Sequence, residues 1–164
     1  MNAFINALKR NNYYAKADII GSSEFPEVRG SVYFYPVAEG TLVKTELFGL
    51  PIAKLPCEEE IFAFHIHEGG RCTGDEEDPF KDAGMHYNPR QCMHPNHAGD
   101  MPPIFGNGGI AWSAFYTNRF IPAQVVGKTV IVHEKIDDFT TQPAGNAGKK
   151  IACGEIRRNF LNFV

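Results

Sequence analysis

The sequence predicts an all-β protein: an antiparallel β-sandwich or β-barrel with two long functional loops and a possible short N-terminal helix. Glycine (16) and proline (11) are frequent among the 164 residues, which favours many turns over long helices. Short segments rich in β-branched and aromatic residues recur along the chain, and polar turn clusters such as LPCEEE and GNGG separate them. Many short strands joined by polar turns are typical of antiparallel sandwiches and barrels. A chain of this length predicts one domain over residues 1–164.

The predicted elements follow in chain order. A short helix is expected within the first dozen residues, where Phe4, Ala7 and Leu8 recur at helical spacing. The segment 30–37 reads GSVYFYPV and predicts a strand, because aromatic and β-branched residues dominate it. By the same reasoning, further strands are expected at residues 14–20, 41–48, 61–67, 109–118, 128–134 and 150–157.

Two long stretches, residues 68–107 and 137–149, do not follow this rhythm. They are rich in Gly, Pro, Asp and Asn and show little alternation. Loops of this length are usually functional or disordered. Because the polar chemistry of the sequence lies in or beside them, the functional interpretation is favoured.

Charge and composition exclude several classes of protein. Sixteen basic residues stand against 19 acidic ones, for a net charge of −3, which argues against a general nucleic-acid binder. No apolar run approaches the ~20 residues that cross a bilayer. The N-terminal segment lacks the continuous apolar core of a signal peptide, which predicts a cytoplasmic protein, or a periplasmic or extracellular one if a leader was removed. Four cysteines are too few for a disulfide scaffold, so one bridge or one metal thiolate remains open.

The first histidine motif is FAFHIHE, which contains His65 and His67. Alternate residues of a strand point to the same face, so both rings share one face while Phe64 and Ile66 can be buried on the other. Two imidazoles about 7 Å apart along a strand can converge on one metal ion. The alternative is a pair of histidines that simply face solvent.

The second motif is GMHYNPRQCMHPNHAGDMP, which offers His86, His94, His97 and Asp100 within one turn-rich segment. Three imidazoles and a carboxylate suit tetrahedral Zn²⁺. A polar surface loop that contains histidines by chance does not explain this density, so a metal site is favoured. His133 ends a predicted strand and is by itself unremarkable, but it is a candidate further ligand for an ion at the first motif.

The motifs in this order resemble the copper/zinc superoxide dismutase family, most closely its bacterial-type members. The resemblance rests on FAFHIHE, GMHYNP, HAGDMP, GKTVIVHEKIDD and GNAGKKIACGEI, and it covers a core of about residues 30–157. It implies an eight-stranded Greek-key β-barrel. It also implies copper and zinc as cofactors and the dismutation of the superoxide anion to O₂ and H₂O₂.

The resemblance also implies a role for each motif residue. The implied copper ligands are His65, His67, His86 and His133. The implied zinc ligands are His86, His94, His97 and Asp100, so that His86 is shared. In the family's reaction the shared histidine, here His86, takes up a proton.

Two further features follow from the resemblance alone. It implies a disulfide between Cys72 and Cys153. It also implies that Asp137 hydrogen-bonds histidines of both metal sites and fixes the orientation of their rings.

The sequence departs from the family at its active-site arginine, where Lys150 stands. A lysine keeps the positive charge, and Lys149 adds another, but a flexible ammonium orients superoxide less well than a planar guanidinium. Cys57 and Cys92 are extra cysteines, interpreted as ordinary small residues. The alternatives are that Cys92 pairs with Cys57, stays free or displaces a zinc ligand.

An active copper/zinc superoxide dismutase is therefore the leading hypothesis. The second is a related metal-binding protein with weak or no activity that acts in copper or zinc handling. It is suggested by Lys150 and by two segments that are short for the family, the loop 137–149 and the interval from His94 to His97. The third is a zinc hydrolase that uses only the HxH pair, which the short β-rich chain disfavours. A homodimer is a further expectation, because the tail offers apolar residues that could pack against the barrel or a second subunit: Phe160, Leu161, Phe163 and Val164.

Overall fold

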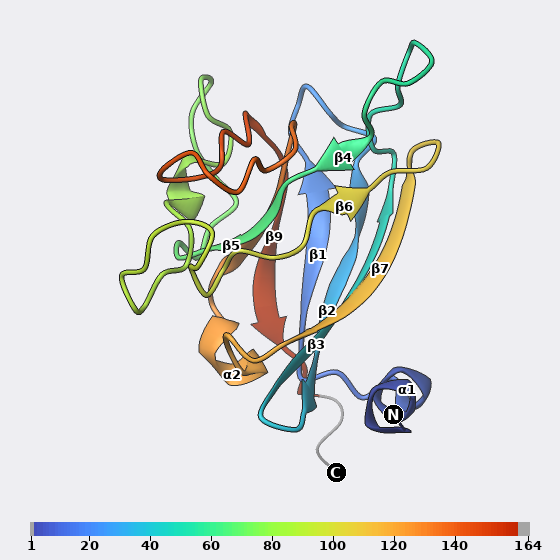
Figure 1. Ribbon diagram of the computed structural model, residues 1–164, viewed down its shortest axis with the longest axis vertical. Coiled ribbons are helices and arrows are strands. Elements are labelled where there is room, and N and C mark those ends of the chain that lie inside the picture. The colour runs from blue at the N-terminus through green and yellow to red at the C-terminus, as the bar shows by residue number, and fades with distance from the viewer. Residues whose placement is uncertain (1, 161–164) are drawn as a thin grey trace.

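A curled antiparallel sheet forms the body of the protein (Figure 1). The structure is a computed structural model that describes residues 2–160. The strands of the main sheet are β1 (Ala15–Gly21), β2 (Arg29–Val37), β3 (Gly40–Phe48), β5 (Phe64–His67), β7 (Ile110–Thr117), β8 (Thr129–His133) and β9 (Lys150–Arg158). They lie in the order β5-β8-β9-β1-β2-β3-β7. The non-consecutive neighbours β5–β8, β9–β1 and β3–β7 are the crossovers that distinguish this barrel from a simple meander.

A second, two-stranded ribbon pairs β4 (Ile61–Phe62) with β6 (Ile104–Phe105). The strand predicted at residues 61–67 is interrupted at Ala63, whose N–H donates to the Lys135 carbonyl (2.8 Å) and whose carbonyl accepts from His133 N–H (2.9 Å). One segment thus pairs first with β6 and then with β8. With β4 and β5 taken as one strand, the described residues form the expected eight strands.

The helices are short. The expected N-terminal helix is present as α1 (Asn2–Arg10), and Ala7 and Leu8 pack against a buried cluster that contains Tyr35 and Leu42. Two short elements were not predicted: α2 (Pro122–Val125) and the 3₁₀ turn η1 (Lys81–Ala83). Like β4 and β6, they are too short to show a periodic hydrophobic pattern.

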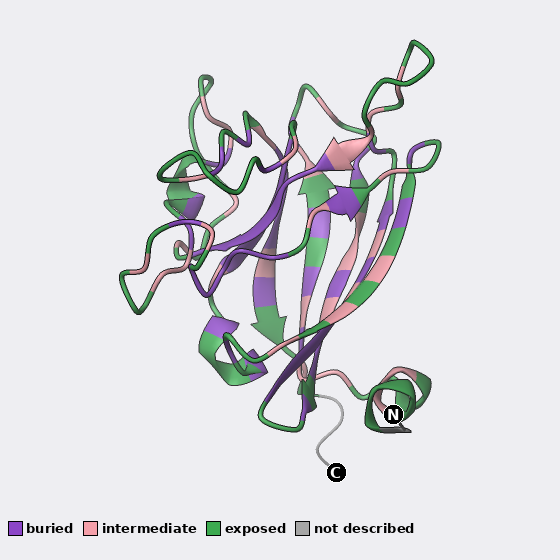
Figure 2. Ribbon diagram, viewed as in Figure 1, coloured by how far each residue is buried: buried purple, intermediate pink, exposed green. Residues whose placement is uncertain are grey.

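The core lies inside the curled sheet. Phe34, Leu47, Phe64, Ile66 and Ile151 are among its largest fully buried side chains. Figure 2 shows exposed residues alternating with buried or half-buried ones along β7, whereas every residue of β5 is buried. A strand buried on both faces must be covered on its outer side, and the long loops provide that cover.

The two predicted loops follow β5 and β8 and lie close together at one side of the sheet (Figure 1). The first is shorter than predicted, because Ile104 and Phe105 join the ribbon with β4. Among the described residues, no helix has the length and apolar character needed to span a membrane. Of the apolar tail residues, Leu161, Phe163 and Val164 lie outside the described residues, and Phe160 is exposed.

Candidate metal centre

The loop after β5 folds back onto the free edge of that strand. Tyr87 N–H donates to the Ile66 carbonyl (2.8 Å), and Ile66 N–H donates to the Gly99 carbonyl (2.9 Å). Isolated bridges place His86 beside His67 and Asp100 beside His65. A side chain at Gly99 would clash with the Ile66 carbonyl, so glycine permits this close approach. Backbone hydrogen bonding therefore brings the second histidine motif to the first.

The predicted site residues form two groups that share one histidine. In each group, one ligand atom from every residue lies within 4.8 Å of the others, and all the residues are buried. The first group is His65, His67, His86 and His133. The second group is His86, His94, His97 and Asp100. All six histidines of the chain lie in these groups.

Backbone carbonyls orient two rings of the first group. His67 Nδ1 donates to the Gly84 carbonyl (2.8 Å), and His133 Nδ1 donates to the Gly148 carbonyl (3.4 Å). Because a carbonyl only accepts, the proton of each neutral ring lies on Nδ1 and the lone pair on Nε2. The two Nε2 atoms face each other at 3.3 Å with no proton between them, an arrangement that a cation would stabilise.

Asp137 orients one histidine from each group. Its carboxylate accepts from His65 Nε2 (2.8 Å) and His94 Nε2 (2.9 Å), as the resemblance implies. Nδ1 of both rings is buried without a hydrogen bond. A side chain at Gly145 would collide with the Asp137 carboxylate, so this close packing also depends on glycine. The carboxylate thus turns one lone pair toward each group.

His86 connects the groups through its two nitrogens. Nδ1 lies 2.8 Å from Asp100 Oδ1 and 3.4 Å from His97 Nδ1, within the second group. Nε2 is buried without a hydrogen bond and belongs to the first group. Asp100 is held in place because its Oδ2 accepts from His97 N–H (2.9 Å).

The electrostatics favour neutral rings beside ionised carboxylates. Burial lowers the pKa of His65, and it lowers the pKa values of His67 and His133 well below the usual 6.5. Burial opposes ionisation of Asp137, but hydrogen bonds from His65 and other donors outweigh it and lower its pKa to about 2. Neutral imidazole and ionised carboxylate are the forms that bind metals.

The donor sets fit copper and zinc. Four imidazole nitrogens in the first group suit Cu²⁺. Three imidazoles and one carboxylate in the second suit tetrahedral Zn²⁺. His65 Nδ1, His86 Nε2 and His94 Nδ1 are buried without a hydrogen bond, and His94 Nδ1 lies 3.1 Å from Asp100 Oδ2. Cations bound to these lone pairs would explain the arrangement, since buried polar atoms rarely lack hydrogen bonds.

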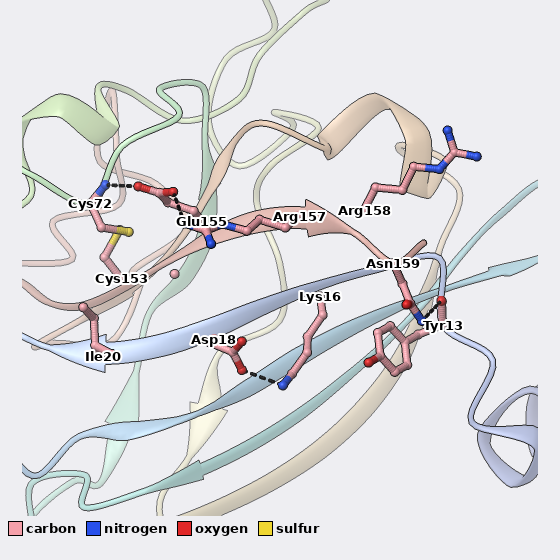
Figure 3. A pocket seen from close by; sticks show the side chains of 11 residues that line it. Tyr13, Lys16, Asp18, Ile20, Cys72, Cys153, Glu155, Arg157, Arg158 and Asn159 are labelled. Atoms are coloured by element: carbon pink, nitrogen blue, oxygen red, sulfur yellow. Dashed lines mark hydrogen bonds and ion pairs between the residues drawn. A yellow bond between two sulfur atoms is a disulfide. The ribbon is translucent and has the colours of Figure 1, made fainter. Parts of the chain in front are cut away.

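The predicted disulfide is present. Cys72 and Cys153 are bonded and join the loop after β5 to β9 across 81 residues of sequence. Figure 3 shows this bond at the edge of a pocket on β1 and β9, where Glu155 accepts from Cys72 N–H. Cys57 and Cys92 are both free, so the pairing of these two cysteines that the sequence left open does not occur.

A pocket of about 430 Å³ opens onto the first group and is lined by His67, His86 and His133 together with Lys149 and Lys150. The two lysines match the sequence prediction of positive charge beside the site.

The sequence did not predict that each of these lysines has a carboxylate partner. Lys150 Nζ lies 2.5 Å from Asp78 Oδ2, and Lys149 Nζ lies 3.2 Å from Glu24 Oε2. The acidic run around Asp78 was the only signal, and it resembles an ordinary surface loop. The backbone carbonyls of Gly84 and Gly148, which orient His67 and His133, could not be predicted either, because they depend on no side chain that the sequence shows.

The comparisons with known proteins agree with this geometry. The profile of the family described as copper/zinc superoxide dismutase (SODC) matches residues 28–156. Superoxide dismutase [Cu-Zn] 2 of Aquifex aeolicus is 34% identical, with 93% of this chain and 92% of the relative covered. Superoxide dismutase [Cu-Zn] of Deinococcus radiodurans is 31% identical, with 85% and 81% covered.

A solved structure supports the fold. Cu/Zn superoxide dismutase from Brucella abortus superimposes with a TM-score of 0.70 and 23% identity, covering 86% of this chain and 98% of that one. The profile match extends over most of the chain, and the Aquifex and Deinococcus relatives are similar along most of their length. The chain therefore belongs to the copper/zinc superoxide dismutase family.

Proposed function

We propose that this protein is an enzyme that dismutates superoxide to O₂ and H₂O₂ with copper and zinc as cofactors. The observation that carries the proposal is the shared histidine: His86 presents one nitrogen to each of two buried donor groups. A pocket reaches the first group, so a small anion has access to it.

In this proposal, copper would be held by His65 Nδ1 and by Nε2 of His67, His86 and His133. For His65, His67 and His133 this assignment is supported by the acceptors that bond to the opposite ring nitrogen, and for His86 by Nε2, which is buried without a hydrogen bond. Zinc would be held by Nδ1 of His86, His94 and His97 and by the Asp100 carboxylate. Support comes from the match between this donor set and the preference of Zn²⁺.

Copper, when bound, supplies the one-electron redox chemistry that zinc cannot, because Zn²⁺ has no accessible second oxidation state. The overall reaction, 2 O₂•⁻ + 2 H⁺ → O₂ + H₂O₂, oxidises one superoxide and reduces another.

The chain must guide the anion and supply protons. His86 Nε2, which makes no hydrogen bond within the described residues, lies beside the pocket and would hold a proton when it is not bound to copper. The Lys150 ammonium lines the same pocket and offers a local attraction that the net charge of −3 does not provide.

The alternatives explain less of the geometry. A zinc hydrolase using only the HxH pair gives no role to His133, whose Nε2 faces that of His67. A metal-handling protein would need to release its metal, whereas these ligands are buried, held by second hydrogen bonds and covered by a disulfide-tethered loop.

The test is to load the protein with one copper and one zinc per chain, confirm the content by metal analysis, and measure superoxide decay at low and high salt. We expect fast decay that slows as salt rises. The control is the same protein loaded with zinc alone, which should not dismutate. Decay no faster than in buffer would refute the dismutase assignment and favour metal handling.

The cellular location and the oligomeric state of the protein need separate experiments. The cytoplasmic location, with a periplasmic or extracellular one if a leader was removed, and the homodimer stay predictions from the sequence. Fractionation of the native cells tests the location. Sedimentation of the metal-loaded protein tests the dimer, which a monomer at all concentrations would contradict.

A further inference from the structure

The pocket above the first histidine group has a charge pattern that simple attraction of an anion does not explain. Its lining contains Lys149 and Lys150, but also the acidic residues Glu24, Glu77 and Asp78. The lysines are each paired with one of these carboxylates. Acidic side chains outnumber basic ones at the entrance to a site whose proposed substrate is an anion.

The two ion pairs differ in burial. Lys149 and Glu24 are 64% and 60% exposed, so water screens their pairing and it fixes little. The Lys150 side chain is only 16% exposed, and that of Asp78 is 37% exposed. Lys150 Nζ also donates to the Phe80 carbonyl (3.2 Å), which gives the ammonium a second fixed acceptor.

Strand pairing in the sheet places Lys150 beside the first histidine group. It begins β9 and lies opposite His133 of β8 in the antiparallel register. Both residues line the same pocket. An ammonium has three donors, so two bonds to Asp78 and Phe80 fix its position and leave one proton for an anion in the pocket.

Asp78 is itself held firmly. Its N–H donates to Asp75 Oδ1 (2.9 Å), and its Oδ1 accepts from Phe80 N–H (3.1 Å). The Asp78 carbonyl accepts from Lys81 N–H (3.1 Å), which closes a tight turn. The disulfide at Cys72 joins the segment that precedes this turn to β9, the strand that carries Lys150.

We propose that Asp78 is a positioning residue that fixes the Lys150 ammonium at the pocket and so turns a flexible lysine into a directed donor for the substrate anion. The fixed position of the ammonium compensates for the absence of a guanidinium group. The negative charge of Asp78 reduces the long-range attraction of the superoxide anion. This inference rests on the proposed dismutase function.

Two substitutions separate position from charge. Asp78→Asn removes the charge and weakens the bond to Lys150. Glu77→Gln removes an equal charge from the same pocket, and no hydrogen bond or ion pair joins its side chain to Lys150 among the described residues. Each substitution removes one negative charge from the pocket entrance, so Glu77→Gln is the matched control.

The first measurement is the ¹⁵N NMR signal of the Lys150 ammonium in the cuprous, zinc-loaded protein, which is diamagnetic. We expect a signal protected from solvent exchange in the wild type and in Glu77→Gln, weaker protection in Asp78→Asn, and loss of the signal in Asp78→Ala, which has no side-chain oxygen to accept from the ammonium. Lys150→Arg assigns the signal. A protected ammonium signal in Asp78→Ala would overturn the proposal, whether or not the protein dismutates superoxide.

The second measurement is the second-order rate constant for superoxide as a function of salt. At low salt, Glu77→Gln should be about twofold faster than wild type, because it removes one repulsive charge. At high salt, where that charge is screened, Glu77→Gln should match wild type. Asp78→Asn should then be about three- to tenfold slower, since misplacement of a directed donor is costly.

The outcomes distinguish this inference from the proposed function. If the two variants have identical salt profiles, Asp78 acts only through its charge and the positioning role is wrong. If the wild type shows no dismutation, the proposed function fails, while the ammonium signal still decides whether Asp78 holds Lys150.

Discussion

Replacing Asp137 with Asn tests how the metal centre is oriented. The carboxylate accepts from His65 Nε2 and His94 Nε2 at 2.8 and 2.9 Å and is 2% exposed. An amide of the same shape has one accepting oxygen and one NH₂ group that only donates. One of the two rings must therefore lose its bond, or move its proton to Nδ1 and block the lone pair that faces the ligand group.

The expected magnitude follows from that lost bond. An unsatisfied buried partner costs about 1–3 kcal/mol. At 1.4 kcal/mol per factor of ten, this corresponds to a roughly 5- to 150-fold loss of affinity for the affected metal. Removing an orienting partner of a ligand histidine typically costs about 10- to 100-fold, which agrees.

The assay is competition of Asp137→Asn with a chromophoric chelator for zinc and for copper. The matched control is Asp138→Asn, because Asp138 lies in the same loop and is exposed, and its carboxylate bonds to Thr140 and Thr141. It reports the effect of disturbing the loop alone. Asp137→Asn with wild-type affinity for both metals would refute the orienting role.

Three further predictions concern the framework around the centre. Replacing Cys153 with Ser should lower the free energy of unfolding by about 4.5 kcal/mol, since the bond to Cys72 closes a loop across 81 residues; equal urea midpoints with the oxidised wild type would contradict this. Phe64→Ala should lower the free energy of unfolding by about 3–5 kcal/mol because Phe64 is 1% exposed, whereas Phe48→Ala at an exposed site should lower it by less than about 0.5 kcal/mol. Similar losses from both substitutions would show that the core is wrongly placed. Burial raises the pKa of Tyr35 to about 12, so the unfolded chain ionises first and stability should fall as pH rises from 10 through about 12. Urea melts over this range should show a smaller fall in Tyr35→Phe, and an identical fall in both would contradict the assigned pKa.

Much of the fold followed from local pattern. The strands that the sequence predicted were long enough for alternation or β-branched enrichment to appear, as in β2, where GSVYFYPV pairs along both edges. The elements that were missed, such as α2, have too few residues for any period. The interruption at Ala63 depends on hydrogen bonds to residues far along the chain, which local pattern cannot reveal.

The metal-ligand groups of the candidate site could be predicted, because residue types and their spacing in the sequence identify them. His65 and His67 alternate along one strand, and the second motif concentrates ligand types in one loop, so both groups could be named. The partner of Lys150 could not be named, because Asp78 reaches it only through the folding of the loop after β5, which the Cys72–Cys153 disulfide joins to β9. The orienting carbonyls of Gly84 and Gly148 likewise depend on backbone path alone.

The central claim is that two different ions share His86. Crystals of the protein loaded with copper and zinc, measured on both sides of each metal's absorption edge, test it directly. The account predicts copper among His65, His67, His86 and His133, and zinc on the other nitrogen of His86 with His94, His97 and Asp100. A single ion, or two ions that do not both contact His86, would contradict it.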